Sequence, residues 1–277
     1  ENLIGRCVVA GNVRRSAALA MGQYQDKEYL QMKNDQEKLY HHRWGSNNSF
    51  NAEVGMDYTW HAEQSQKNGE PGYIWLDNAR THGRFKDGLK YDDVNVAGFN
   101  PCVEQQLEDA ELCCLVETFP AKHDDYEDYL KTLKIAYLYG KTITLSNTHW
   151  PETNAKMLKN RRIGLSQSGV VQAFNKFGRR TMLTWCDNAY SHVKELDEEY
   201  SNWLCIPKSV RMTSIKPSGT VSLLNGSTPG IHFPESEYYI RRIRFSKDNA
   251  LVTSLKDAGY KIEEDAYSPN TYCVEFP

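Results

Sequence analysis

The chain has 277 residues, of which 40% are hydrophobic and 25% are charged, and its formal net charge is −3. This composition is typical of a folded globular protein with one large domain or two modest ones. A charge so close to zero gives no broad positive field, which argues against nucleic acid or an anionic membrane as the main partner. No apolar run of about 18 residues occurs, so the sequence predicts no transmembrane helix.

The seven cysteines are an odd number without regular spacing, and no apolar leader precedes them. This pattern is typical of a reducing compartment, and we expect a cytoplasmic protein. The chain starts ENLIGRC without an initiator methionine and ends YCVEFP in a predicted strand. We therefore expect a piece of a longer protein.

The first third of the chain combines one apolar segment with two helical patterns. Residues 3–21 are predicted to form a strand or buried segment that turns at glycine, with Cys7 as a core thiol. Helical spacing follows over residues 24–44 and again over 54–69, where Gly69 is expected to end the helix.

Strands and helices alternate through the middle of the chain. LVETFP (115–120) is a predicted strand, and the next helix is expected to begin near Asp125 and end at Gly140. TITLS (142–146) and RRIGLS (161–166) are predicted strands, whereas helices are expected from Pro151, over 168–178 and over 179–204. This alternation predicts an α/β fold.

The stretch NPCVE (100–104) carries the clearest chemical signal. In an extended backbone, Asn100, Cys102 and Glu104 would lie on one side, and Cys113 follows with Cys114 beside it. Amide, thiol and carboxylate groups suit radical or thiol redox chemistry. A zinc site would show paired C-x2-4-C or H-x3-5-H spacing, so no metal site is predicted. The alternative is that each cysteine is a small buried hydrophobic residue.

A second candidate stretch is KPSGTVSLL (216–224). Pro217, Ser218, Gly219 and Thr220 offer hydroxyls and approachable backbone N–H groups at a turn, which can bind a phosphate without a Walker lysine. Lys216 would assist there as a point charge. The alternative is an ordinary Ser- and Gly-rich turn. Arginine pairs also recur, as at 161–162, and each pair binds either a structural carboxylate or helix end, or a phosphate.

Several stretches together resemble the ribonucleotide reductases, in the order found in that family. The text TPGIHFP followed by YYIRRIRF resembles the single-chain adenosylcobalamin-dependent ribonucleoside-triphosphate reductases of class II. The resemblance covers residues 1 to about 246. Its other motifs are VVAGNVRRSA (8–17), SNNSF (46–50), GEPGYIWLDNA (69–79), NPCVE (100–104), ELCCLVE (111–117), NRRIGLSQSG (160–169) and KPSGTVSLL (216–224).

The resemblance implies a fold that periodicity alone cannot supply. The family has a ten-stranded α/β barrel with a finger loop that carries the catalytic cysteine through its centre. Residues 1–277 would then be part of this catalytic barrel, with further parts of the protein outside the chain.

The resemblance also implies roles for the residues and a cofactor. Adenosylcobalamin would generate a thiyl radical on Cys102, which takes the substrate's 3′ hydrogen. Glu104 would be the general base, Asn100 would orient the sugar hydroxyls, and Cys113 would form a redox-active disulfide with a cysteine outside the chain. Pro217, Ser218, Gly219 and Thr220 (217–220) would hold the substrate phosphates.

The expected activity is reduction of ribonucleotides, with triphosphates favoured, to 2′-deoxyribonucleotides for DNA synthesis. Expected partners are a thioredoxin-like reductant and a dNTP effector that binds outside the chain. Two alternatives stay open. One is a reductase of another class with a radical from a partner subunit, and the other is an inactive nucleotide-binding paralogue or fragment.

Overall fold

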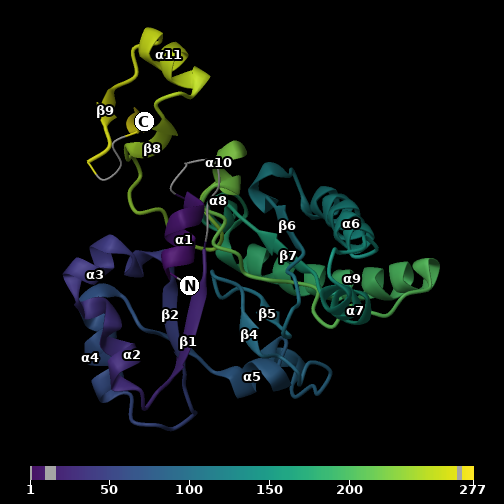
Figure 1. Cartoon of the computed structure of the whole chain (residues 1–277). Helices are drawn as coiled ribbons and strands as arrows, with labels where there is room; N and C mark the ends of the chain where they lie inside the picture. The colour runs from purple at the N-terminus through teal and green to yellow at the C-terminus, as the bar shows by residue number, and fades with distance from the viewer. Residues whose placement is uncertain (1, 10–16, 267–269) are drawn as a thin grey trace. The chain divides into compact units, whose positions relative to one another are not determined.

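The computed structural model describes residues 2–9, 17–266 and 270–277 (Figure 1). It divides into two compact units, one formed mainly by Ala17–Phe233 and the other mainly by Pro234–Pro277. Most of the motif at residues 8–17 lies outside the described residues.

The first unit begins with a three-stranded parallel sheet. Its order is β1 (Leu19–Gln23), β2 (Asn47–Asn51) and β3 (Gly72–Ile74), with Leu19 opposite Asn47 and Ser49 opposite Gly72. Parallel neighbours need crossover connections, and helices supply them. The crossovers contain α2 (Lys27–Gln31), α3 (Gln36–His41) and α4 (Thr59–Asn68), with short 3-10 turns at Met32–Asn34 and Arg43–Gly45.

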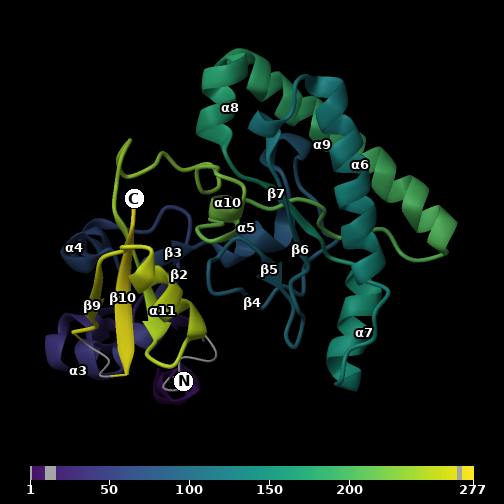
Figure 2. The ribbon, with the colours of Figure 1, turned by 90° about the horizontal axis from the view of Figure 1, so that it is seen from above.

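A second parallel pair, β6 (Leu115–Thr118) and β7 (Gly164–Gln167), follows later in the first unit. Leu165 also bridges to Thr213 in parallel, so the segment after the last long helix runs along the other edge of β7. The helices of this part are α6 (Tyr126–Ile143), α7 (Pro151–Asn160), α8 (Val170–Phe177) and α9 (Arg179–Leu204). Figure 2 shows α6 and α9 beside this strand pair.

An antiparallel hairpin separates the two parallel sheets in the chain. It is formed by β4 (Gly98–Phe99) and β5 (Gln106–Leu107), so residues 100–105 are its turn. The remaining elements of this unit are α5 (Leu76–Thr81), α10 (Val221–Leu224) and the 3-10 turns Phe85–Asp87 and Pro120–Lys122.

The main core lies between β7 and the helices α6 and α9. The buried side chains of this core come from one face of each helix, as expected for amphipathic helices on a sheet, and from the strand segment at 163–165. They are Tyr129, Leu133, Tyr137, Ile163, Leu165, Ala173, Met182, Trp185, Ala189, Val193, Leu196 and Tyr200. A smaller cluster of Leu30, Phe50 and Ala52 packs beneath the first sheet.

Several predicted elements are confirmed. The predicted α/β alternation is present, Asp125 caps α6 through a 2.9 Å bond from the Asp128 N–H, and Gly69 ends α4 in the left-handed conformation. None of the described helices is both long enough and apolar enough to cross a membrane.

Two predictions for residues 140–146 are wrong. The helix does not end at Gly140 but continues to Ile143, so most of the predicted TITLS strand is helix and turn. Packing requires a small residue at position 140, because a Cβ there would lie 3.1 Å from Val116 Cγ2 and 3.2 Å from Ile163 Cγ2. The glycine lets α6 approach the strands rather than ending the helix.

A buried polar cluster crosses this core. The Lys141 ammonium donates to Asp197 Oδ1 at 2.6 Å and to Ser209 Oγ at 3.0 Å, and Tyr137 Oη donates to the same carboxylate at 2.7 Å. Burial lowers the pKa of Lys141, and the contacts with Asp197 oppose this effect. The cluster therefore joins α6, α9 and the segment after α9.

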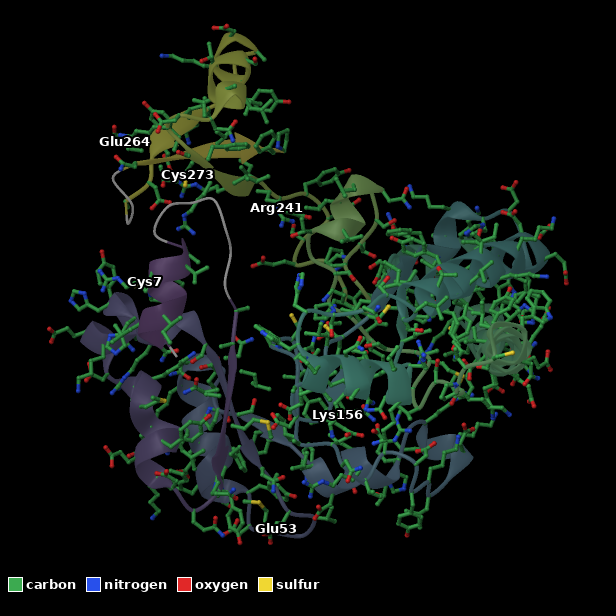
Figure 3. All side chains as sticks on the ribbon, turned by 45° about the vertical axis from the view of Figure 1, so that its right-hand side comes forward. Cys7, Glu53, Lys156, Arg241, Glu264 and Cys273 are labelled. Atoms are coloured by element: carbon green, nitrogen blue, oxygen red, sulfur yellow. The ribbon has the colours of Figure 1, made fainter. Side chains whose placement is uncertain are left out.

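The second unit is built around an antiparallel sheet. Its order is β8 (Arg241–Ser246), β10 (Thr271–Phe276) and β9 (Ile262–Glu264), and α11 (Ala250–Asp257) connects β8 to β9. Cys273, labelled in Figure 3, is buried and its thiol contacts Asp265 Oδ2 at 3.3 Å. Near the N-terminus, Asn2–Val9 form α1 with Cys7 exposed, so the predicted strand and core thiol are wrong there.

Asp197→Ala should lower the free energy of unfolding by about 3–5 kcal/mol, because it leaves a fully buried ammonium without its ion-pair partner. Urea unfolding measures this change. The matched control is Glu198→Ala. The Glu198 carboxylate pairs with Lys208, and both side chains are about 60% exposed, so the free energy of unfolding should fall by less than about 1 kcal/mol. Equal losses in the two variants would show that the buried pair contributes nothing special.

Candidate active site

The predicted chemical stretch NPCVE forms the turn of the β4–β5 hairpin. Asn100 Oδ1 accepts the Gln105 N–H at 3.0 Å, and the Val103 N–H bonds to the Asn100 carbonyl at 2.9 Å. Val103 has φ of 63°. These bonds close the loop, so the predicted extended backbone with three side chains on one side is wrong.

The closed turn gives its three candidate residues different surroundings. Asn100 is buried, and its amide oxygen is committed to the loop. Cys102 is exposed, whereas the Glu104 side chain is only 1% exposed. A reachable thiol and a desolvated carboxylate thus lie two residues apart.

Glu104 is held by a distant segment of the chain. Its Oε1 accepts from Lys216 Nζ at 2.7 Å, and its backbone carbonyl accepts from Ser214 Oγ at 2.8 Å. Its Oε2 is buried and has no hydrogen-bond partner among the described residues. A buried carboxylate oxygen is normally satisfied, so this atom is open to a ligand.

Cys113 lies at the same site. Desolvation raises the pKa of its thiol, the nearby Glu104 carboxylate raises it further, and the Lys216 ammonium opposes both effects. Cys102 also acts electrostatically on this thiol. Cys113 is an exposed thiol that interacts electrostatically with Cys102, Glu104 and Lys216, and its raised pKa favours the S–H form.

Cys114 has a different environment from its neighbour. It is buried, and its thiol contacts the Gly140 carbonyl at 3.6 Å. Burial raises the pKa of this thiol as well. Cys114 therefore belongs to the packing between β6 and α6.

The second predicted stretch begins directly after Lys216. Ser218 is buried with φ of 52°, and its carbonyl accepts from Ser222 Oγ at 2.7 Å. Its own hydroxyl is buried without a partner among the described residues, as are the hydroxyls of Ser227 and Thr228. Pro217, Gly219 and Thr220 complete this turn, and Lys216 connects it to the cysteine loop.

Gly164 on β7 allows the cysteine loop to pack closely on the sheet. A Cβ at Gly164 would lie 2.4 Å from Gln105 Oε1 and 3.0 Å from Ser214 Cβ. Only a residue without a side chain leaves room for both segments. Gln105, the residue after Glu104, is thus packed against the first residue of β7.

Buried ion pairs fix the ends of the hairpin. Arg162 binds Asp93 through two 2.7 Å bonds and Glu111 through a 3.0 Å bond, and all three side chains are 0% exposed. Asn160 donates to Glu111 and to Glu108 at 3.0 Å each. The arginine at 162 therefore binds structural carboxylates, which was one of the two readings of the arginine pairs.

Glu108 extends this cluster to the surface. Lys159 binds its Oε1, and Lys156 of α7, labelled in Figure 3, binds its Oε2, each at 2.8 Å. Burial raises the pKa of Glu108, but the bonds from Lys156, Lys159 and Asn160 outweigh it and lower the pKa to about 2.

Comparison with known proteins now identifies this arrangement. No family model matches the chain. A probable adenosylcobalamin-dependent ribonucleoside-triphosphate reductase of Dictyostelium discoideum is 52% identical over the whole chain, and the Euglena gracilis enzyme is 48% identical. Over its whole length the chain is similar to ribonucleotide reductases. It spans 37% and 38% of the length of these two relatives, so it is a fragment.

Solved structures agree with this family. A crystal structure of a B12-dependent, class II ribonucleotide reductase matches the whole chain with a TM-score of 0.84 at 37% identity, and the match covers 42% of that protein. An Actinobacillus ureae class Id alpha subunit matches 88% of the chain with a TM-score of 0.59 at 14% identity, which shows the fold alone. The expected fold, part of the reductase α/β barrel, is confirmed.

The sequence did not reveal what Lys216 contacts. We expected it to act beside a phosphate, but its ammonium binds the Glu104 carboxylate, 112 residues away. The unpartnered hydroxyls of Ser227 and Thr228 were also missed. Both residues follow the KPSGT motif closely in the chain. Their hydroxyl groups were the only sequence signal that they could belong to the same site.

Lowering the pH should remove the stability that Glu108 contributes. Its folded pKa of about 2 lies below the ordinary 4.5, so the contribution is complete above about pH 4.5 and is lost as the pH falls toward 2, up to about 3 kcal/mol. Urea unfolding between about pH 5 and pH 3 should therefore show a smaller pH slope in Glu108→Gln than in the wild type. The control Glu127→Gln replaces an exposed carboxylate and should keep the wild-type slope. A wild-type slope in Glu108→Gln would contradict the assignment.

Proposed function

We propose that the full-length protein reduces ribonucleotides to 2′-deoxyribonucleotides by thiyl-radical chemistry, for DNA precursor synthesis. The observation that carries this proposal is the buried Glu104 carboxylate, which has one oxygen without a partner among the described residues, shares a closed loop with Cys102 and interacts electrostatically with Cys113. The curated relatives are named adenosylcobalamin-dependent ribonucleoside-triphosphate reductases. Residues 1–277 would then be part of the catalytic barrel.

Cys102 is the proposed radical residue. Loss of a 2′-hydroxyl from an unactivated carbon becomes feasible when a radical is present at C3′. A thiyl radical on Cys102 would create it by taking the hydrogen atom from C3′. Adenosylcobalamin, when bound, supplies the radical that removes the thiol hydrogen atom. The exposed position of Cys102 fits this role, because its thiol must be reachable by the cofactor.

Glu104 is the proposed general base. A base needs hydrogen-bond reach of the proton that it removes, and Oε2 is the carboxylate oxygen that is free to accept the 3′-hydroxyl proton. Asn100 would orient the sugar through its amino group, because its carbonyl oxygen is already used by the loop. The 2′-hydroxyl then leaves as water after one of the two reducing thiols has supplied its second hydrogen.

Cys113 is the proposed source of reducing equivalents. Two thiols would supply two electrons and two hydrogens and end as a disulfide, after which Cys102 returns a hydrogen atom to C3′. The raised pKa of Cys113 favours the S–H form that such a donor needs. Its partner would be a cysteine elsewhere in the full-length protein, and a thioredoxin-like protein would reduce the disulfide.

The turn of Pro217, Ser218, Gly219 and Thr220 is the proposed phosphate site. The buried, unpartnered hydroxyl of Ser218 supports it, and those of Ser227 and Thr228 extend it. We infer a triphosphate substrate from the names of the relatives, together with a dNTP effector that binds outside this chain. All seven cysteines are free thiols, which supports a reducing, cytoplasmic compartment.

Cys102→Ser in the full-length protein should abolish nucleotide reduction, because serine does not form a comparable radical. The assay uses a ribonucleoside triphosphate, adenosylcobalamin and a dithiol, without a second subunit. Cys205→Ser, which replaces another exposed cysteine, should keep the wild-type rate. Normal turnover by Cys102→Ser would refute the assignment. If the wild type gives product only with a metal-bearing partner subunit, the protein belongs to another reductase class, and inactivity under both conditions indicates an inactive paralogue.

Cys113→Ser should stop repeated turnover with a thioredoxin-type reductant, because the active-site disulfide can no longer form. The measurement is product per enzyme over time. Cys114→Ser is the matched control, since it changes the adjacent buried thiol that faces α6, and multiple turnovers should continue. Sustained turnover by Cys113→Ser would exclude Cys113 as a reductant.

A further inference from the structure

Lys216 lies at the junction of the two candidate stretches. Its side chain is 26% exposed, and its ammonium is bound to Glu104 Oε1 at 2.7 Å. Burial lowers the pKa of Lys216, but the hydrogen bond and charge of Glu104 raise it by more, so the ammonium stays charged. The same ammonium lowers the pKa of the Cys113 thiol.

The backbone around Lys216 is fixed to the sheet. Its N–H donates to Ser166 Oγ on β7 at 3.0 Å, and the Ser214 N–H donates to the Leu165 carbonyl at 3.0 Å. Ser214 Oγ in turn binds the Glu104 carbonyl. The segment at 214–216 therefore holds both the backbone and the side chain of Glu104 against one strand.

This arrangement makes the two carboxylate oxygens unequal. Oε1 is occupied by the ammonium, and Oε2 is buried and unpartnered among the described residues. A carboxylate that could rotate would present either oxygen in several orientations. One held by a charge-assisted bond to an anchored lysine presents a single oxygen in a single direction.

We propose that Lys216 is a positioning residue for Glu104, and this inference rests on the proposed function. The lysine binds Oε1 and so aims Oε2 at the proton of the substrate's 3′-hydroxyl. Lys216 acts through Glu104 and does not contact the reacting atoms.

A different role for Lys216 would be to bind a substrate phosphate, because Pro217 and Ser218 follow it directly. The two roles predict different kinetics. A positioning lysine acts in the transition state and changes kcat, whereas a phosphate ligand binds substrate and transition state alike and changes KM.

The test is a double-mutant cycle in the full-length protein with adenosylcobalamin, a ribonucleoside triphosphate and a dithiol. Lys216→Met should lower kcat by about 100-fold, as expected for a misplaced catalytic group, with KM changed by less than about threefold. Adding Lys216→Met to Glu104→Gln should cause no further loss, since the lysine acts only through the carboxylate. Lys208→Met, which removes an exposed ion pair, should leave both constants unchanged.

Two results would overturn the proposal. A raised KM with unchanged kcat in Lys216→Met would make the lysine a phosphate ligand. Additive losses in the double variant would show that it acts independently of Glu104.

A second readout separates this proposal from the reductase activity itself. Alkylation of Cys113 by iodoacetamide is followed by peptide mass spectrometry in the full-length protein without nucleotide. Lys216→Met should slow this alkylation at least about twofold, and Glu104→Gln should accelerate it, because the two charges act oppositely on the thiol. Unchanged rates in both variants would remove Lys216 and Glu104 from the site, whether or not the protein reduces nucleotides.

Discussion

The cysteine hairpin depends on one buried guanidinium. Arg162 binds Asp93, which precedes β4, and Glu111, which follows β5, so it holds both ends of the hairpin. Burial disfavours the charge, yet the bonds to the two carboxylates raise the pKa of Arg162. None of the three side chains reaches water, so their charges must be compensated within the protein. Arg211 adds a second cation, with its Nε 3.4 Å from Asp93 Oδ2. The segments that flank the hairpin are therefore fixed, while its turn carries Cys102 and Glu104, the residues proposed for catalysis.

The segment 162–168, which contains β7 (Gly164–Gln167), contacts several segments of the site. Successive side chains of a strand point to opposite faces. Ile163 and Leu165 enter the main core. The alternate positions face the site: Arg162 binds the hairpin ends, Gly164 admits Gln105, Ser166 Oγ binds the Lys216 N–H and Ser168 Oγ binds the Gly230 N–H. One face of the segment 162–168 thus enters the core, and the other contacts the cysteine loop and the segment that carries the proposed phosphate turn.

Local signals explain which parts of the fold could be predicted. The cap at Asp125 and the stop at Gly69 are short-range features, and the sequence revealed both. Gly140 was misread because the same residue type serves as a helix end and as a packing position. Only the contact with Val116 and Ile163 distinguishes the two. The Thr and Ile alternation after it favoured a strand, but the helix and its tertiary contacts overrode that local preference.

The site was predictable in composition and not in geometry. The motif NPCVE named an amide, a thiol and a carboxylate, but the extended backbone was wrong because Asn100 bonds back to Gln105. The lysine on Glu104 comes from 112 residues away, and no local pattern reports such a contact. Residue types can therefore indicate the chemistry, while the pairing of charges is decided by the fold.

Val103 shows why the loop has this shape. A β-branched residue with positive φ is an outlier, and such conformations cost on the order of 1–3 kcal/mol and cluster at functional sites. At Val103 the reversal separates its two neighbours, so that Cys102 is exposed while the Glu104 side chain is buried. An extended backbone would have given the thiol and the carboxylate the same surroundings. The roles proposed for Cys102 and Glu104 call for a reachable thiol and a shielded carboxylate, and the turn at Val103 provides both within three residues.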